Sequence, residues 1–167
     1  MIFIGLGSNQ GDPVEHLVRA IRSMPEKGVI PIRLSSLYHT PAWGIKDQSD
    51  FANAVAEVSF EGSAEALLDI LLEIEQDMGR TRIQKWGPRL IDLDILEFRR
   101  FQIQSERLQI PHPWYHRRAF VMVPLQELEP DWIPTAQHKS LTQLLSLLPE
   151  HELQIAPIAH EEWHKLV

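Results

Sequence analysis

The chain has 167 residues, 44% of them hydrophobic and 23% charged, which predicts a single domain over residues 1–167 with its own buried core. It contains no cysteine, which excludes disulfides and thiolate metal sites and is typical of a cytoplasmic protein. The net charge of −7 argues against general binding to nucleic acid or to anionic membranes, and no apolar run reaches the roughly 18 residues that a membrane span needs.

Apolar periodicity and helix caps predict six elements in the first hundred residues. Strands are expected over residues 2–6, 29–38, 51–60 and 90–98, which are rich in apolar and β-branched residues. Helices are expected from the N-cap Asp12 to Pro25 and from the N-cap Ser63 to Gly79. The order strand, helix, strand, strand, helix, strand predicts a ferredoxin-like α+β fold, an antiparallel sheet with helices packed on it.

The rest of the chain gives weaker patterns. We expect a short hairpin after residue 98, a proline-rich turn at 110–113 and a helix from about Val123. A last helix is expected to carry Leu141, Leu144, Leu145 and Leu148. Residues 150–167 have no clear periodicity, so we describe residues 131–167 only as a C-terminal helix and tail.

Two carboxylates in the fourth predicted strand are the first candidate for chemistry. Asp92 and Asp94 are two residues apart, so their side chains point to one face of the strand, with Cα atoms about 6.6 Å apart. Carboxylates at this spacing can share metal ions, and oxygen ligands without cysteine favour a hard cation such as Mg²⁺. Taken alone, the pair could equally be two solvated acids on an exposed face.

A basic segment leads directly into this strand. Arg80, Arg82, Lys85 and Arg89 place four cations within ten residues of an otherwise acidic chain. The planar guanidinium group binds pairs of phosphate oxygens, and phosphoryl transfer needs mainly positioning, metal and positive charge. The segment therefore predicts a phosphate clamp beside a metal site, although a solvated loop with surface ion pairs is the simpler alternative.

A second pattern competes with this interpretation. Residues 160–164 read His-Glu-Glu-Trp-His and match the HExxH pattern of zinc hydrolases. Only three residues follow it, and no third ligand is marked upstream, so a frayed terminus is the better interpretation. His112 alone favours a turn histidine rather than a ligand.

Several separated motifs together resemble one family. In chain order they are Gly7-Ser8-Asn9, residues 36–41, Arg80-Thr-Arg82, Trp86-Gly-Pro-Arg89, Asp92-Leu-Asp94-Ile95, Pro111-His112 and Arg118-Ala-Phe120. This series, over about residues 1–130, resembles the 6-hydroxymethyl-7,8-dihydropterin pyrophosphokinases of folate biosynthesis. The resemblance implies a transfer of pyrophosphate from Mg·ATP to the pterin hydroxymethyl group with release of AMP. Its implied partners are these two small molecules, and we expect a monomer.

The resemblance also implies roles for individual residues. Two Mg²⁺ ions would be held by Asp92 and Asp94, and moving phosphates would be neutralised by Arg80 and Arg89. ATP would contact Arg80, Arg82, Trp86, Arg89, Ile95, Arg107 and His112. The pterin would contact Thr40, Pro41, Ala42, Trp43, Phe51, Asn53, Arg118 and Phe120, with the ring between Phe51 and Phe120 and its edge against Asn53.

This chain departs from the family pattern at a few positions. Phe51 stands where a tyrosine is common, Lys85 where an arginine is expected, and Leu72 where a polar residue precedes Glu75. Ala42-Trp43 replaces a Pro-Leu pair. None of these changes removes the predicted metal ligands, so an enzyme is favoured over a module that binds nucleotide or pterin without turnover.

Overall fold

The structure is a computed structural model that describes residues 1–41, 49–79 and 90–167. Six strands form one sheet in the order β5-β1-β4-β3-β8, and β2 also pairs with β4. All of these pairs are antiparallel. The strands are β1 (Ile2–Ser8), β2 (Ile30–Leu34), β3 (Leu37–Thr40), β4 (Phe51–Ser59), β5 (Asp92–Phe98) and β8 (Ala156–Ile158). The separate two-stranded sheet consists of β6 (Ile103–Gln104) and β7 (Gln109–Ile110).

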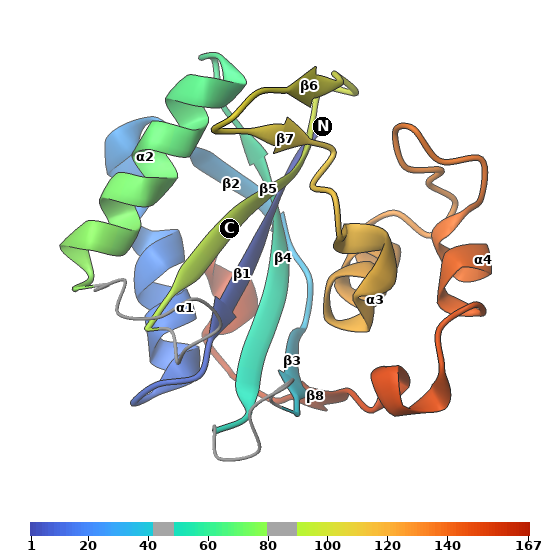
Figure 1. Ribbon diagram of the computed structural model, residues 1–167. Coiled ribbons are helices and arrows are strands. Elements are labelled where there is room, and N and C mark those ends of the chain that lie inside the picture. The colour runs from blue at the N-terminus through green and yellow to red at the C-terminus, as the bar shows by residue number, and fades with distance from the viewer. Residues whose placement is uncertain (42–48, 80–89) are drawn as a thin grey trace.

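Helices cover both faces of the sheet (Figure 1). The α-helices are α1 (Pro13–Ser23), α2 (Ala64–Asp77), α3 (Ala119–Leu128) and α4 (Leu141–Leu145). Short 3-10 helices are η1 (Pro25–Lys27), η2 (Tyr115–Arg117), η3 (Glu150–Leu153) and η4 (Trp163–Leu166). The antiparallel sheet with packed helices confirms the predicted α+β class. Within the described residues, no helix is both long and apolar enough to span a membrane.

Two apolar cores follow from the alternation of side chains along the strands. Ile2, Ile4 and Leu6 of β1 face α1 and α2, together with alternate residues of β4 and β5. Phe3 of β1 and Val55 of β4 point the other way, toward α3 and α4. The sheet is therefore the middle layer of three, and each face buries apolar side chains against a different helix pair.

Local signals explain where the first two helices begin. Asp12 accepts a hydrogen bond from the backbone N–H of Glu15, 3.1 Å away, and Pro13 occupies the first turn, where it needs no donor. Ser63 caps α2 in the same way, through the N–H of Ala66 at 3.1 Å. Gly79, with φ of +90°, follows α2 at the position where left-handed backbone stops a helix.

The sequence prediction of one strand over residues 29–38 was wrong, because the segment forms two strands. At the break, the Ser35 N–H donates to the Val55 carbonyl, while the Ser35 hydroxyl accepts the Val55 N–H, both at 2.9 Å. A side chain thus replaces a backbone acceptor, which ends regular pairing. Hydrophobic alternation continues through the serine and gave no sign of it.

The later helices also differ from their predicted bounds. The helix expected from Val123 begins at Ala119, because Pro124 lies inside α3 rather than in its first turn. The last predicted helix ends at Leu145, three residues before Leu148. Its start is defined by a capping box between Ser140 and Gln143.

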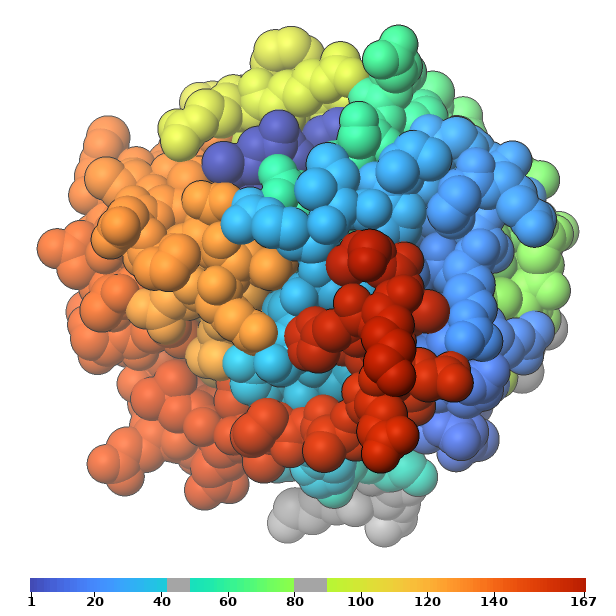
Figure 2. Space-filling model, turned by 180° about the vertical axis from the view of Figure 1, so that it is seen from behind, coloured from blue at the N-terminus to red at the C-terminus, as the bar shows by residue number. Residues whose placement is uncertain are grey.

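The C-terminal residues form an integral part of the fold, so the interpretation of this segment as a frayed terminus was wrong. β8 pairs with β3, and η4 places Trp163 in the first core with 1% of its surface exposed. The indole N–H of Trp163 donates to the Ser35 carbonyl at 2.6 Å. Figure 2 shows this segment, in red, lying across the early part of the chain, in blue.

Candidate active site

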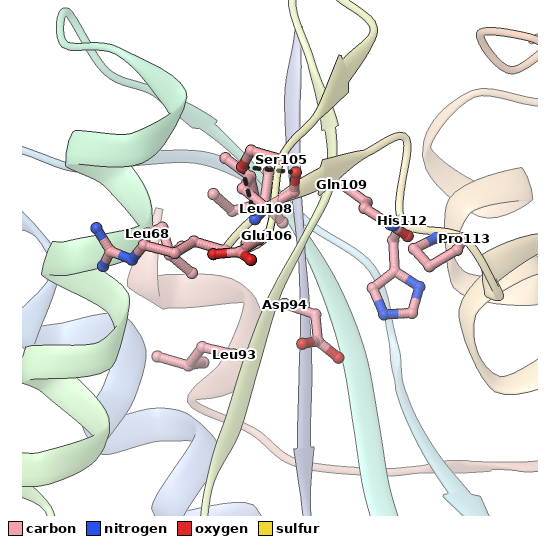
Figure 3. A pocket seen from close by; sticks show the side chains of 11 residues that line it. Leu68, Leu93, Asp94, Ser105, Glu106, Leu108, Gln109, His112 and Pro113 are labelled. Carbon is pink, nitrogen blue, oxygen red and sulfur yellow. Dashed lines mark hydrogen bonds between the residues drawn. The ribbon is translucent and has the colours of Figure 1, made fainter.

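The two predicted carboxylates occupy one face of β5, as their spacing requires. Leu93 and Ile95 are buried in the core below α1 and α2, so Asp92 and Asp94 point to the opposite face, toward α3. Both aspartates are half-buried. Figure 3 shows Leu93 and Asp94 directed to opposite sides of the strand.

Two glycines of β1 lie between this pair and Asn53 on β4. Asp92 lies opposite Gly7 and Asp94 opposite Gly5 on β1, and Gly7 in turn lies opposite Asn53 on β4. A Cβ atom added to Gly7 would stand 3.0 Å from the Asn53 Oδ1, a distance that forces something to move. The missing side chain at Gly7 therefore leaves the space over β1 into which the Asn53 side chain extends, toward Asp92.

The predicted pterin residues on β3 and β4 lie on this same face. Asn53 is 5% exposed, and its Nδ2 donates to the Thr40 hydroxyl at 2.7 Å. Thr40 lies opposite Phe51, which is half-buried, and Pro41 follows at the surface. The hydrogen bond fixes the plane of the Asn53 amide and uses one of its two N–H donors.

The start of α3 brings the remaining described pterin residues over this face. Arg118 immediately precedes the helix, and its guanidinium carbon lies 5.7 Å from the centroid of the Phe120 ring. Phe120 is half-buried and packs against the second core. Phe51, Asn53 and Phe120 therefore approach from two layers that face each other.

A pocket of about 260 Å³ lies beside the aspartates, between α2, β5 and the β6–β7 hairpin (Figure 3). Its lining consists of Leu68, Leu93, Asp94, Ile95, Ser105, Glu106, Arg107, Leu108, Gln109, His112 and Pro113. Three predicted ATP residues, Ile95, Arg107 and His112, thus meet here with one metal candidate. Leucine and isoleucine walls with a few polar groups are typical of a small-molecule site.

His112 stands at the inner end of this pocket as a neutral group. Burial and, to a smaller extent, the nearby Arg118 lower its pKa to about 4, and Asp92 partly opposes both. Its Nδ1 accepts the Trp114 backbone N–H at 3.2 Å, so the proton of the neutral ring is on Nε2. His112 can therefore offer an N–H donor near the aspartates without adding positive charge.

Arg107 is held at the outer side of the pocket. Its guanidinium donates to the Asp69 carboxylate of α2 at 2.5 Å, while 61% of the arginine side chain stays exposed. Asp69 was not predicted. Its signal is weak, because an exposed acid on a helix has many explanations and its partner is 38 residues away.

Glu75 is a second residue that the sequence prediction missed. Only 3% of it is exposed, and its Oε1 accepts the Leu93 N–H at 2.7 Å, on the strand of the two aspartates. A signal was available, since Glu75 follows Leu71 by four residues and therefore shares its buried helical face. A carboxylate on such a face needs a partner, and here it supports the outer edge of β5.

Ser8 and Asn9, at the end of β1, hold the beginnings of the two functional strands. The Ser8 hydroxyl donates to the Leu90 carbonyl at 2.6 Å, two residues before Asp92. The Asn9 Nδ2 donates to the Ser49 carbonyl at 3.2 Å, two residues before Phe51. One turn therefore positions the metal candidates and the aromatic candidate relative to each other.

Some predicted residues lie outside the described residues. They are Ala42, Trp43, Arg80, Arg82, Lys85, Trp86 and Arg89.

The zinc-hydrolase pattern at 160–164 is not built on one α-helix. The 3-10 helix η4 begins within it at Trp163, which is buried in the core. Glu162 forms an ion pair with Arg22 at 3.0 Å. Across residues 1–41, 49–79 and 90–167, no group of three potential histidine or carboxylate ligands gathers to hold a metal.

Comparison with known proteins gives one consistent result. The family model described as 7,8-dihydro-6-hydroxymethylpterin-pyrophosphokinase (HPPK) matches residues 3–130. The 2-amino-4-hydroxy-6-hydroxymethyldihydropteridine pyrophosphokinase of Methylorubrum extorquens is 41% identical over 132 residues, covering 78% of this chain and 84% of the relative. The enzyme of the same name from Haemophilus influenzae is 40% identical over 153 residues, covering 90% and 94%.

Solved structures agree at the level of the fold. A wild-type Plasmodium falciparum HPPK-DHPS crystal structure with pteroate superimposes with a TM-score of 0.68 at 16% identity. The match covers 87% of this chain but only 41% of the longer one, so this chain spans less than half of that protein.

Proposed function

The chain belongs to the 7,8-dihydro-6-hydroxymethylpterin-pyrophosphokinase family, and we propose from this that it transfers pyrophosphate from ATP to 6-hydroxymethyl-7,8-dihydropterin in folate biosynthesis. The observation that carries the proposal is the position of Asp92 and Asp94. On one side of them lies the pocket with Ile95 and His112. On the other side, two strand spacings or about 10 Å away, lies Asn53.

In the proposed reaction, the hydroxymethyl oxygen of the pterin attacks the β-phosphorus of ATP. The bond from that phosphorus to the oxygen bridging the α- and β-phosphates breaks, AMP leaves, and the hydroxyl loses its proton. The protein forms no covalent bond to either substrate in such a transfer. Its residues act by positioning both substrates and by offsetting the negative charge of the phosphates.

Asp92 and Asp94 would hold Mg²⁺, two ions in our proposal. The residues suit this cation: both are hard oxygen ligands, both lie on one face, and buried Leu93 and Ile95 anchor the strand behind them. When bound, Mg²⁺ supplies positive charge that offsets the phosphate oxygens.

The pocket would take the adenosine part of ATP. Leu68, Leu93 and Ile95 offer apolar contact to a flat base, and Arg107 offers a donor at the outer side. The Nε2–H of His112 would donate toward the phosphates. By resemblance to the family, Arg80, Arg82, Trp86 and Arg89 would complete the nucleotide contacts.

The pterin would lie on the opposite side of the aspartates. Phe51 and Phe120 would stack on its faces, and Asn53, oriented by Thr40, would match its amide-like edge. Arg118, Pro41, Ala42 and Trp43 would line the remaining boundary. We also propose that the protein works as a monomer in the cytoplasm, on small molecules rather than on nucleic acid or membrane.

One reaction separates this proposal from its alternatives. The protein is mixed with Mg·ATP and 6-hydroxymethyl-7,8-dihydropterin, and AMP and the pterin diphosphate are separated and quantified. We expect both products, and neither when the pterin or Mg²⁺ is omitted. Binding of either substrate without AMP would indicate a binding module, and activity restored after chelation by Zn²⁺ but not by Mg²⁺ would indicate a zinc enzyme.

A further inference from the structure

The carboxylate of Glu127, near the end of α3, connects this helix to the segment that leads into β3. It accepts the Ser36 backbone N–H at 3.0 and 2.8 Å through its two oxygens and the Ser36 hydroxyl at 2.9 Å. It also accepts the Tyr38 hydroxyl at 3.0 Å. Burial, and then Glu127 itself, raises the pKa of Tyr38 to about 12, so Tyr38 remains a donor at neutral pH.

The strand end of this connection lies beside the predicted pterin contact. Tyr38 is the direct neighbour of Asn53 in the β3–β4 ladder, so the two side chains share a face. Thr40, two residues further along β3, receives the Asn53 amide at 2.7 Å. A shift of β3 relative to the rest of the site would therefore reorient Asn53.

The helix end of the connection faces the same way as Phe120. Seven residues separate Phe120 from Glu127, which is roughly 20° short of two full helical turns, so both side chains leave the same face of α3. The helix itself is held by Val121, Met122 and Leu125 in the second core. Glu127 is exposed, and so it contributes little to that packing.

We propose that Glu127 is a positioning residue for the pterin site, one that fixes α3, with Phe120, against β3 and β4, with Asn53. It touches neither substrate in this account. The inference rests on the proposed function, because its readout is pterin binding. Its physical basis is that a displacement of about 1 Å in a binding constellation is enough to lower affinity or rate strongly.

The chain offers a matched control on the same helix end. Glu129 is also a carboxylate that anchors this region, through its ion pair with Arg33. Arg33 further donates to Glu57 at 2.7 Å and to the Leu128 carbonyl at 2.9 Å. Arg33 lies on β2 opposite Glu57 of β4, and Glu57 is four residues from Asn53. The network therefore supports the fold without contacting the segment that orients Asn53.

The test measures KM for the pterin at saturating Mg·ATP and KM for ATP at saturating pterin, together with melting curves. We expect Glu127→Ala to raise the pterin KM about tenfold with the ATP KM within about twofold. Glu127→Gln, which keeps an acceptor, should raise it less. Glu129→Ala should lower the melting temperature more than Glu127→Ala and leave the pterin KM unchanged.

Tyr38→Phe removes a single hydroxyl and serves as a second variant if Glu127→Ala does not fold. We expect it to raise the pterin KM about threefold, since one of the donors to Glu127 is lost. An unchanged pterin KM in either variant, or an equal rise in both KM values, would overturn the inference. A wild-type protein that forms no AMP would instead contradict the proposed function, and calorimetric pterin binding to the same variants would then test Glu127.

Discussion

Asp92 and Asp94 differ from ordinary surface acids in what surrounds them. On β1 beside them, Gly7 and Gly5 carry no side chains of their own, and the side chains of Asn53 and Leu96 extend over these two positions. Buried Leu93 and Ile95 fix the strand from behind. The metal-bound triphosphate that we propose for this site needs such rigid support.

We predict that Asp92→Asn or Asp94→Asn lowers turnover at least about 100-fold, because each removes an anionic metal ligand while keeping the side-chain size. The melting temperature should stay close to that of the wild type. The exposed Asp131→Asn is the matched control and should retain full activity. Near-normal rates for both variants at saturating Mg²⁺ would refute the metal assignment.

Phe51 allows the stacking proposal to be separated from a core role. The residue is half-buried, so Phe51→Ala should cost less stability than the about 3–5 kcal/mol of a fully buried aromatic. We predict weaker pterin binding, with ATP binding and thermal stability nearly intact. Calorimetric titration with each ligand, beside a melting curve, measures both. A destabilised variant with unchanged pterin affinity would contradict the stacking role.

Among the helices and strands, the sequence predicted those that are defined by neighbouring residues along the chain. The apolar segments 51–60 and 90–98 predicted β4 and β5, and the caps Asp12 and Ser63 located α1 and α2. The spacing of Asp92 and Asp94 placed them correctly on one face. The break at Ser35 was missed because it depends on Val55, and β8 because its pairing with β3 joins segments about 120 residues apart.

In the candidate site too, sequence motifs were found, whereas residues that act through distant partners were missed. The resemblance led to residues of the pocket and of the proposed pterin site, and three of the ATP candidates do meet at one pocket with Asp94. Glu127 and Asp69 were not found, because their contacts are with Tyr38 and Arg107, partners that only the tertiary structure brings near.

The C-terminal tail illustrates an element whose importance the sequence did not indicate. We predict that Trp163→Ala lowers the melting temperature by about 10 °C, since a buried indole leaves a cavity and the Ser35 carbonyl loses its donor. Trp163→Phe should cost less. The exposed Leu147→Ala is the control. A melting temperature of Trp163→Ala within 1 °C of the wild type would contradict this role. A truncation after Ala159 also removes Trp163 and should therefore destabilise the protein as well.

In the whole molecule, different parts of the chain contribute the candidate site and additional core packing. The family match covers residues 3–130, which include both the pocket residues and the proposed pterin contacts of the candidate site. The later residues add α4, the strand β8 and the Trp163 contact, and thereby extend both cores. The edge strand β5 thus carries the aspartates, with the pocket toward α2 and the proposed pterin contacts toward α3.

The most direct test of this account follows the β-phosphorus of ATP. ATP carrying a radioactive label at that position is incubated with the protein, Mg²⁺ and 6-hydroxymethyl-7,8-dihydropterin, and the products are separated by chromatography. We predict that the label appears in the pterin diphosphate while unlabelled AMP accumulates in an equal amount. Label that remains in ADP, or that is released as free phosphate or pyrophosphate without a pterin product, would contradict the account.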